Sequence, residues 1–220
     1  PSPAVTFIAI PKIIISSKFM ANVPADEYCY KPRRAAKQSV HGRVSTIPAR
    51  LTGYGERWEK DRCFLFAEGI VQQSAVFAEN LHLIRRIEVE VGTNEIHLCD
   101  RVVNRGFYRT PHMFCYHINV SYPVLDQGSR YIAPIKQVVW AGHEGENYQL
   151  AYDENGRAPV ALVNDRLAIG LEVVTRQDQF PCMFEWQNLQ RGQYAFAIEP
   201  STHNVTGNLK ARERGEMIWL

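Results

Sequence analysis

Over most of this chain, apolar and polar residues alternate with a period of two, the pattern of half-buried β-strands rather than helices. Residues 86–91 alternate strictly, the Gly-Thr-Asn sequence at 92–94 is a turn signal, and residues 95–100 alternate again. Because successive side chains of a strand point to opposite faces, this pattern predicts a hairpin with one solvated face.

Further strands are predicted in the second half of the chain. The Asp-Glu-Asn-Gly sequence at 153–156 predicts a hairpin turn, and the Gln-Arg-Gly-Gln sequence at 190–193 predicts another. No long, capped amphipathic helix stands out. Short strands separated by Gly, Asn and Pro are typical of an all-β antiparallel sandwich or barrel. The strands expected around these two turns are residues 149–152, 159–163, 167–174, 183–186 and 194–198.

Composition restricts the possible partners and the compartment. The net charge of +2 is too small to produce an electrostatic field that would attract nucleic acid. The basic run at residues 31–37 is interpreted as a solvated loop. No stretch approaches the roughly 20 apolar residues of a transmembrane helix, so no membrane partner is expected. Five cysteines, an odd number without CxxC spacing, argue against a disulfide framework and a zinc ribbon. We therefore expect free thiols and a cytoplasmic location.

Two parts of the chain differ in pattern. Residues 7–15 are β-prone, but residues 21–37 show no clear period. We therefore expect a poorly patterned segment over residues 1–40, followed by one β-sandwich domain over residues 41–220. The sequence leaves the oligomeric state open.

The first candidate site lies in an apolar, aromatic run. His117 shares a strand face with Asn119 and Ser121, whereas Tyr116 and Ile118 point the other way. If this polar face lines a cleft, His117 and Asn119 meet a ligand together. The alternative is a solvated face of an ordinary antiparallel strand.

The second candidate is a carboxylate at the end of an apolar run. Glu199 continues the small-residue face of Ala195 and Ala197 and precedes Pro200, which cannot continue a ladder. Small residues beside a carboxylate leave room for a ligand, although a strand-end Glu can equally turn to solvent. A His and a Glu in apolar surroundings can be tuned for proton transfer near neutral pH.

Other chemistries lack their residue patterns. His112 and His117 are five apart and so point to opposite faces of a strand, which argues against a shared metal ion. There is no GxxxxGK[ST], GxGxxG or GxSxG motif. A Cys115–His117 nucleophile pair stays open, but a thiol in an apolar run is more often inert. No metal ion and no cofactor are therefore expected.

Three stretches in this order resemble the galactose mutarotase (aldose 1-epimerase) superfamily, in an uncharacterised epimerase-like branch. They are the His-Gly-Arg element at residues 41–43 with Ser45, Pro48 and Ala49, the central block at 100–104 and 113–125, and the Glu block at 197–202. The similarity extends from about His41 to the C-terminus. It implies a large antiparallel β-sandwich that binds a small-molecule sugar on its concave face.

The resemblance also implies roles for individual residues. His117 matches the general acid, Glu199 the general base, and His41 a second histidine that polarises the sugar. Candidates for sugar contacts are Arg43, Asn119, Asp165, Trp186 and Lys210. Superfamily members usually carry more β structure before the His-Gly element and a further closing strand, so a shortened or partial domain is also considered.

The resemblance therefore implies an enzyme that interconverts sugar anomers by acid–base ring opening. The alternative function is a carbohydrate-binding β-sandwich module without catalysis, in which Trp140, Trp186 and Tyr122 stack on sugar faces. A truncated and inactive fragment is the third interpretation. A ligand-sized gap between His117 and Glu199 would favour the enzyme.

Overall fold

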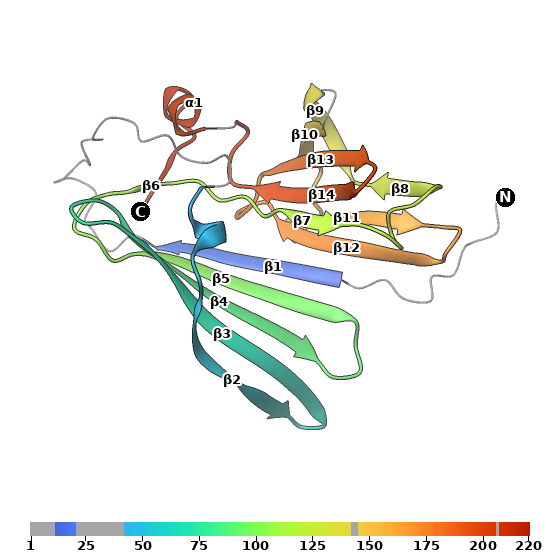
Figure 1. The fold of residues 1–220 in the computed structure, drawn as a ribbon, viewed down its shortest axis with the longest axis horizontal. Helices are drawn as coiled ribbons and strands as arrows, with labels where there is room; N and C mark the ends of the chain where they lie inside the picture. The colour runs from blue at the N-terminus through green and yellow to red at the C-terminus, as the bar shows by residue number, and fades with distance from the viewer. Residues whose placement is uncertain (1–11, 21–41, 142–144, 206) are drawn as a thin grey trace. The chain divides into compact units, whose positions relative to one another are not determined.

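The computed structural model describes residues 12–20, 42–141, 145–205 and 207–220. The chain divides into two compact units, each described here by itself. The first unit contains the described parts of Pro1–Ile15, Gly92–Ile96 and Met113–Glu216, and the second contains those of Ser16–Val91, His97–His112 and Met217–Leu220. Strands dominate both units (Figure 1).

The second unit is built on an antiparallel meander. Strand β2 (Arg50–Glu59) pairs with β3 (Arg62–Ser74), and β3 pairs with β4 (Asn80–Glu90). Strand β5 (Glu95–Asn104) follows β4 in the sheet, which confirms the hairpin predicted around residues 92–94. The unit also holds the 3₁₀ helix η1 (Val44–Thr46) and the short pair β6 (Pro111–His112) and β15 (Ile218–Trp219).

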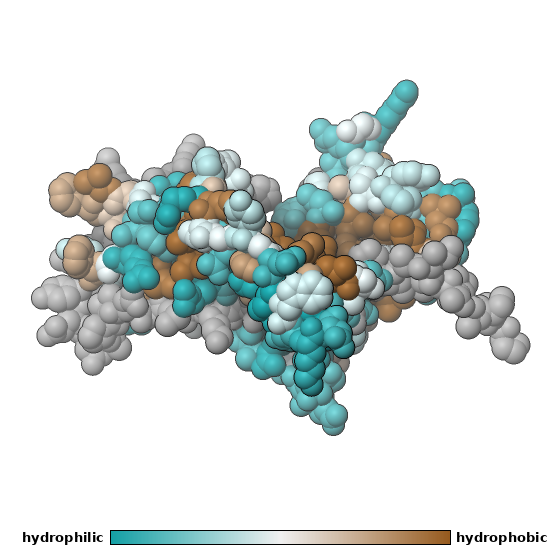
Figure 2. Space-filling model, turned by 90° about the horizontal axis from the view of Figure 1, so that it is seen from below, coloured by the Kyte–Doolittle hydropathy of each residue, from teal (hydrophilic) through white to brown (hydrophobic). Residues whose placement is uncertain are grey.

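The two faces of this meander differ in chemistry. One face carries Phe64 and Phe66 beneath the guanidinium groups of Arg57, Arg62 and Arg86. The register places Tyr54, Trp58 and Leu65 on the opposite face, where they are exposed. Figure 2 shows hydrophobic residues gathered at several places on the molecular surface among hydrophilic ones.

The first unit contains two sheets. In one, the order is β1–β12–β11–β8, where the start of β1 pairs with β12 in parallel and the other pairs are antiparallel. In the other, the order is β7–β14–β13–β10–β9, and every pair is antiparallel. The bounds are β1 (Lys12–Met20), β7 (Ile118–Val120), β8 (Ser129–Ile132), β9 (Ile135–Ala141), β10 (Gly145–Leu150), β11 (Arg157–Asn164), β12 (Ile169–Arg176), β13 (Cys182–Gln190) and β14 (Gln193–Ser201), with helix α1 (Asn208–Glu213) after them.

The two sheets of the first unit pack face to face as a β-sandwich. The Tyr131 ring of β8 lies 5.0 Å from the Phe196 ring of β14 and 6.1 Å from the Tyr148 ring of β10, measured between centroids. Val160 and Ile198, one on each sheet, are completely buried. The inward-facing apolar residues of the two sheets thus form a core, which confirms the predicted all-β sandwich.

One predicted hairpin is wrong. Residues 153–156 do form a turn, in which Gly156 N donates to Asp153 O at 2.9 Å. However, β10 before the turn lies in one sheet and β11 after it lies in the other. The turn therefore connects the two layers, whereas the turn at residues 191–192 joins β13 and β14 as a true hairpin.

Part of the N-terminal segment is a strand. Residues 1–40 were expected to be poorly patterned, and β1 (Lys12–Met20) lies within them, overlapping the β-prone stretch at 7–15. His41 lies outside the described residues. Among the residues that are described, no helix has the length and apolar character needed to span a membrane.

Candidate functional site

Strand register brings His117 and Glu199 together. Strand β7 pairs with β14 so that Ile118 faces Ile198, and a separate bridge joins Cys115 to Ser201. Both pairs fit one continuous register, in which residue 117 lies opposite residue 199. The side chains meet accordingly: His117 Nε2 is 3.0 Å from Glu199 Oε1. An imidazole and a carboxylate that are 82 positions apart in the chain therefore lie in direct polar contact.

These two residues share one face of the five-stranded sheet with other predicted site residues. Because antiparallel partners point to the same side, the register places Asn119 and Trp186 on either side of Ala197. The His117 and Trp186 ring centroids are 5.7 Å apart. We call this surface the site face, defined by His117, Asn119, Trp186, Ala197 and Glu199. Two expectations are confirmed: His117 and Asn119 share a strand face, and so do Glu199 and Ala197.

The opposite face of the same strands is core, and it fixes the position of the pair. Ile198 and Tyr116, the chain neighbours of Glu199 and His117, are buried. The Tyr116 ring packs 5.4 Å from Phe180, between centroids. The pair is 31% exposed at His117 and 15% exposed at Glu199, so a ligand can reach it from solvent.

A cysteine lies beside the carboxylate. Cys115 Sγ is 3.9 Å from Glu199 Oε2 and 3.3 Å from the backbone oxygen of Tyr116. Desolvation by surrounding protein atoms, together with the nearby Glu199 charge, raises the pKa of the Cys115 thiol to about 12. The thiol is therefore protonated at neutral pH, so Cys115 is a hydrogen-bond donor to Glu199 and not a thiolate nucleophile.

The other predicted sugar-contact residues lie elsewhere. Asp165 is in the turn after β11, in the other sheet, and accepts two hydrogen bonds from Arg130, whose guanidinium lowers the pKa of that carboxyl. Lys210 is exposed on α1. Arg43 belongs to the second unit and forms an ion pair with Glu79. Within the described ranges, no cluster of three or more His, Cys, Asp or Glu side chains is arranged to hold a metal ion.

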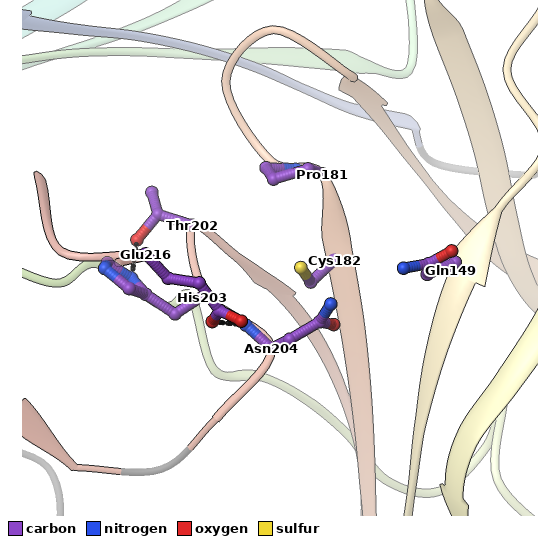
Figure 3. Close-up of a pocket in the computed structure, with 7 residues that line it drawn as sticks. All are labelled: Gln149, Pro181, Cys182, Thr202, His203, Asn204 and Glu216. Atoms are coloured by element: carbon purple, nitrogen blue, oxygen red, sulfur yellow. Dashed lines mark hydrogen bonds between the residues drawn. The ribbon is translucent and has the colours of Figure 1, made fainter. Parts of the chain in front are cut away.

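A cavity of about 190 Å³ with several polar lining residues also lies in the first unit (Figure 3). Its lining comes from the ends of β10 and β13 and from the segment after β14. Sequence alternation does not reveal this cavity, because most of its residues lie outside regular strands. The lining residues are Gln149, Pro181, Cys182, Thr202, His203, Asn204 and Glu216.

The fold matches that of a known structure. The crystal structure of a "putative aldose 1-epimerase" from Klebsiella pneumoniae subsp. pneumoniae MGH 78578 superposes with a TM-score of 0.73 at 23% sequence identity. The match covers 82% of this chain and 53% of that one, so this chain spans about half the length of that structure. The chain therefore has the β-sandwich fold of an aldose 1-epimerase-like protein.

The sequence also matches the model of a protein family. The family described as "Domain of unknown function (DUF4432)" matches residues 27–149 and 144–220, and the chain belongs to that family. No curated protein matches the chain.

Proposed function

We propose that this protein interconverts the anomers of an aldose or an aldose derivative. The observation that carries the proposal is the direct polar contact of His117 and Glu199 on a partly exposed sheet face. The fold shared with a protein described as a "putative aldose 1-epimerase", and the order of the three sequence motifs, support it further.

The reaction needs one acid and one base close together. Glu199 removes the proton from the anomeric hydroxyl, His117 gives a proton to the ring oxygen, and the bond between that oxygen and the anomeric carbon breaks. The aldehyde forms, rotates about its C1–C2 bond, and recloses with both proton transfers reversed. Each positioned acid or base contributes roughly 10²–10⁴-fold to such a step.

The separation of the pair differs from the expected ligand-sized gap. At 3.0 Å, His117 Nε2 and Glu199 Oε1 are in direct contact and leave no room for a ring between them. The two oxygens that exchange protons, however, are bonded to the same anomeric carbon. A sugar therefore does not need to lie between the two groups. Its C1 edge approaches from one side and replaces their direct contact: the anomeric hydroxyl donates to Glu199, and the ring oxygen accepts from His117.

The rest of the site face suits a sugar ring. Trp186 is partly exposed and offers an aromatic surface beside His117, with 5.7 Å between the two ring centroids. Aromatic rings hold the apolar face of a sugar while its hydroxyl groups remain free for polar contacts. We assign Asn119, which lies on the same face, to one such contact.

A carbohydrate-binding module without catalysis is the second candidate. The direct contact between His117 and Glu199 favours it, because a ligand that stacks on Trp186 can leave this pair closed. The four described cysteines, none of which is in a disulfide, support the further proposal of a reducing, cytoplasmic location.

The two candidates are separated by comparing binding with turnover. Anomer exchange of aldoses is measured by NMR on the wild type and on His117→Gln, and sugar binding is measured on the same samples by calorimetry. The enzyme proposal expects exchange that His117→Gln reduces by at least 10²-fold while binding persists. Binding without any exchange in the wild type would leave the binding module as the function.

A further inference from the structure

The cavity of Figure 3 lies next to the proposed acid–base pair, on the same sheet. Cys182, which lines the cavity, pairs with Ser201 of β14, and Ser201 is two residues beyond Glu199. Two residues along a strand span about 6.8 Å. Ser201 is also bridged to Cys115, whose Sγ lies 3.9 Å from Glu199 Oε2. The cavity therefore begins one side-chain row from the proposed base.

Two residues that line the cavity carry buried polar atoms without a hydrogen-bond partner. In the part of the chain that the structure describes, Asn204 Oδ1 and His203 Nε2 are buried without a hydrogen bond. His203 itself is 1% exposed, and its other ring nitrogen contacts the Thr202 hydroxyl. A buried polar atom without a partner is costly and calls for an explanation, such as a bound group. Figure 3 shows the side-chain amides of Gln149 and Asn204 facing the space beside Cys182.

The charge of the cavity selects the kind of group that fits. The described lining residues include the Glu216 carboxylate and no Lys or Arg. Burial lowers the pKa of His203, so its ring is neutral at pH 7. An anionic phosphate or carboxylate would meet the like charge of the Glu216 carboxylate there, with no Lys or Arg among the described lining residues. A hydroxyl group, in contrast, can donate to Asn204 Oδ1 or Glu216 and can accept from Gln149.

The volume indicates that the cavity holds only part of a ligand. Its 190 Å³ is below the roughly 300–1,000 Å³ of pockets that enclose a drug-sized molecule. Together with its position beside Glu199, this size fits a substituent of a larger substrate whose reacting ring sits on the site face.

We propose that the cavity lined by Gln149, Asn204 and Glu216 is a subsite for an uncharged, hydroxyl-bearing substituent, so that the preferred sugar is larger than a free monosaccharide. This inference rests on the proposed function for the identity of the reacting ring. It assigns the substrate class as a reducing di- or oligosaccharide, or a similarly extended neutral sugar, and it excludes sugar phosphates.

The test measures binding separately from catalysis. Glucose, maltose, lactose and glucose 6-phosphate are titrated calorimetrically into the full chain carrying Glu199→Gln, and anomer exchange of the same sugars is measured on the wild type. A disaccharide is expected to bind about tenfold more tightly than glucose, the effect of one or two added hydrogen bonds, and glucose 6-phosphate more weakly than glucose.

Variants locate the effect in the cavity. Asn204→Ala removes a side chain whose Oδ1 makes no hydrogen bond, while the backbone N and O of Asn204 keep theirs to Glu216 and Asn147. It should remove the disaccharide preference without lowering the melting temperature. Glu216→Gln should restore binding of glucose 6-phosphate. Gln177→Ala, an exposed amide outside both sites, is the matched control and should change neither.

The outcomes separate this inference from the proposed function. Disaccharide-selective binding that Asn204→Ala removes, with no anomer exchange in the wild type, would uphold the subsite and refute the enzyme. Exchange of glucose with equal binding of mono- and disaccharides, unchanged in Asn204→Ala, would refute the subsite alone. Failure of every sugar to bind would refute both.

Discussion

Ile198→Ala tests whether the strand that carries Glu199 is anchored in the way the structure shows. Ile198 is completely buried on the inner face of β14, one residue before the proposed base. Truncating a fully buried Ile to Ala costs about 2–5 kcal/mol, because apolar contacts are lost and a cavity remains. For a chain of this size, each kcal/mol shifts the melting temperature by about 2–4 °C.

The assay is urea-induced unfolding monitored by circular dichroism, and Leu189→Ala is the matched control. Leu189 is 54% exposed on the neighbouring strand β13, so its truncation should cost less than about 0.5 kcal/mol. If Ile198→Ala costs no more than Leu189→Ala, the two faces of β14 are assigned the wrong way round. Glu199 would then point into the core, and the site face would not exist.

Three further variants test separate parts of the structure. Burial raises the pKa of Glu185 from 4.5 to about 6. The folded state therefore binds more protons than the unfolded state over this range, and the free energy of unfolding falls by about 2 kcal/mol in total as the pH rises from about 4.5 to 6. Glu185→Gln should remove that loss in urea melts at pH 4.5 and pH 7, and an unchanged difference between the two pH values would contradict this explanation. Cys115→Ala removes a hydrogen-bond donor to Glu199 and should shift the acidic limb of the anomer-exchange pH profile upward by less than about one unit, whereas Cys99→Ala should leave the profile in place. A Cβ at Gly145 would lie 2.2 Å from the backbone oxygen of Glu185, so Gly145→Ala should disrupt the β10–β13 pairing. It should lower the melting temperature well below that of Gly53→Ala, where the nearest atom to the added Cβ is 3.9 Å away. Equal melting temperatures of the two variants would refute the pairing.

The alternation of residues was sufficient to predict which side chains share a face. Tyr116 and Ile118 were assigned to one side and His117 and Asn119 to the other, and the register agrees. This works because the side-chain period of a strand depends only on local backbone geometry. The same reasoning correctly placed Glu199 with Ala195 and Ala197.

Pairing between distant strands could not be predicted in this way. The contact of His117 with Glu199 depends on a register between segments far apart in the chain, which alternation within each segment does not determine. The turn at residues 153–156 was recognised, but its local sequence does not indicate that the chain passes from one sheet to the other there. The cavity escaped notice because residues 202–204 and Glu216 lie outside regular strands and carry no periodic pattern.

The most direct measurement of the central claim is the rate of anomer exchange in the wild type and in Glu199→Gln, determined by saturation-transfer NMR at equal protein concentration. The substitution keeps the shape of the side chain and removes its ability to accept a proton. We predict that the wild type accelerates exchange of at least one neutral aldose above the buffer rate and that Glu199→Gln returns it to within a few per cent of that rate. Equal rates in both proteins, above the buffer rate, would show that this carboxylate is not the base.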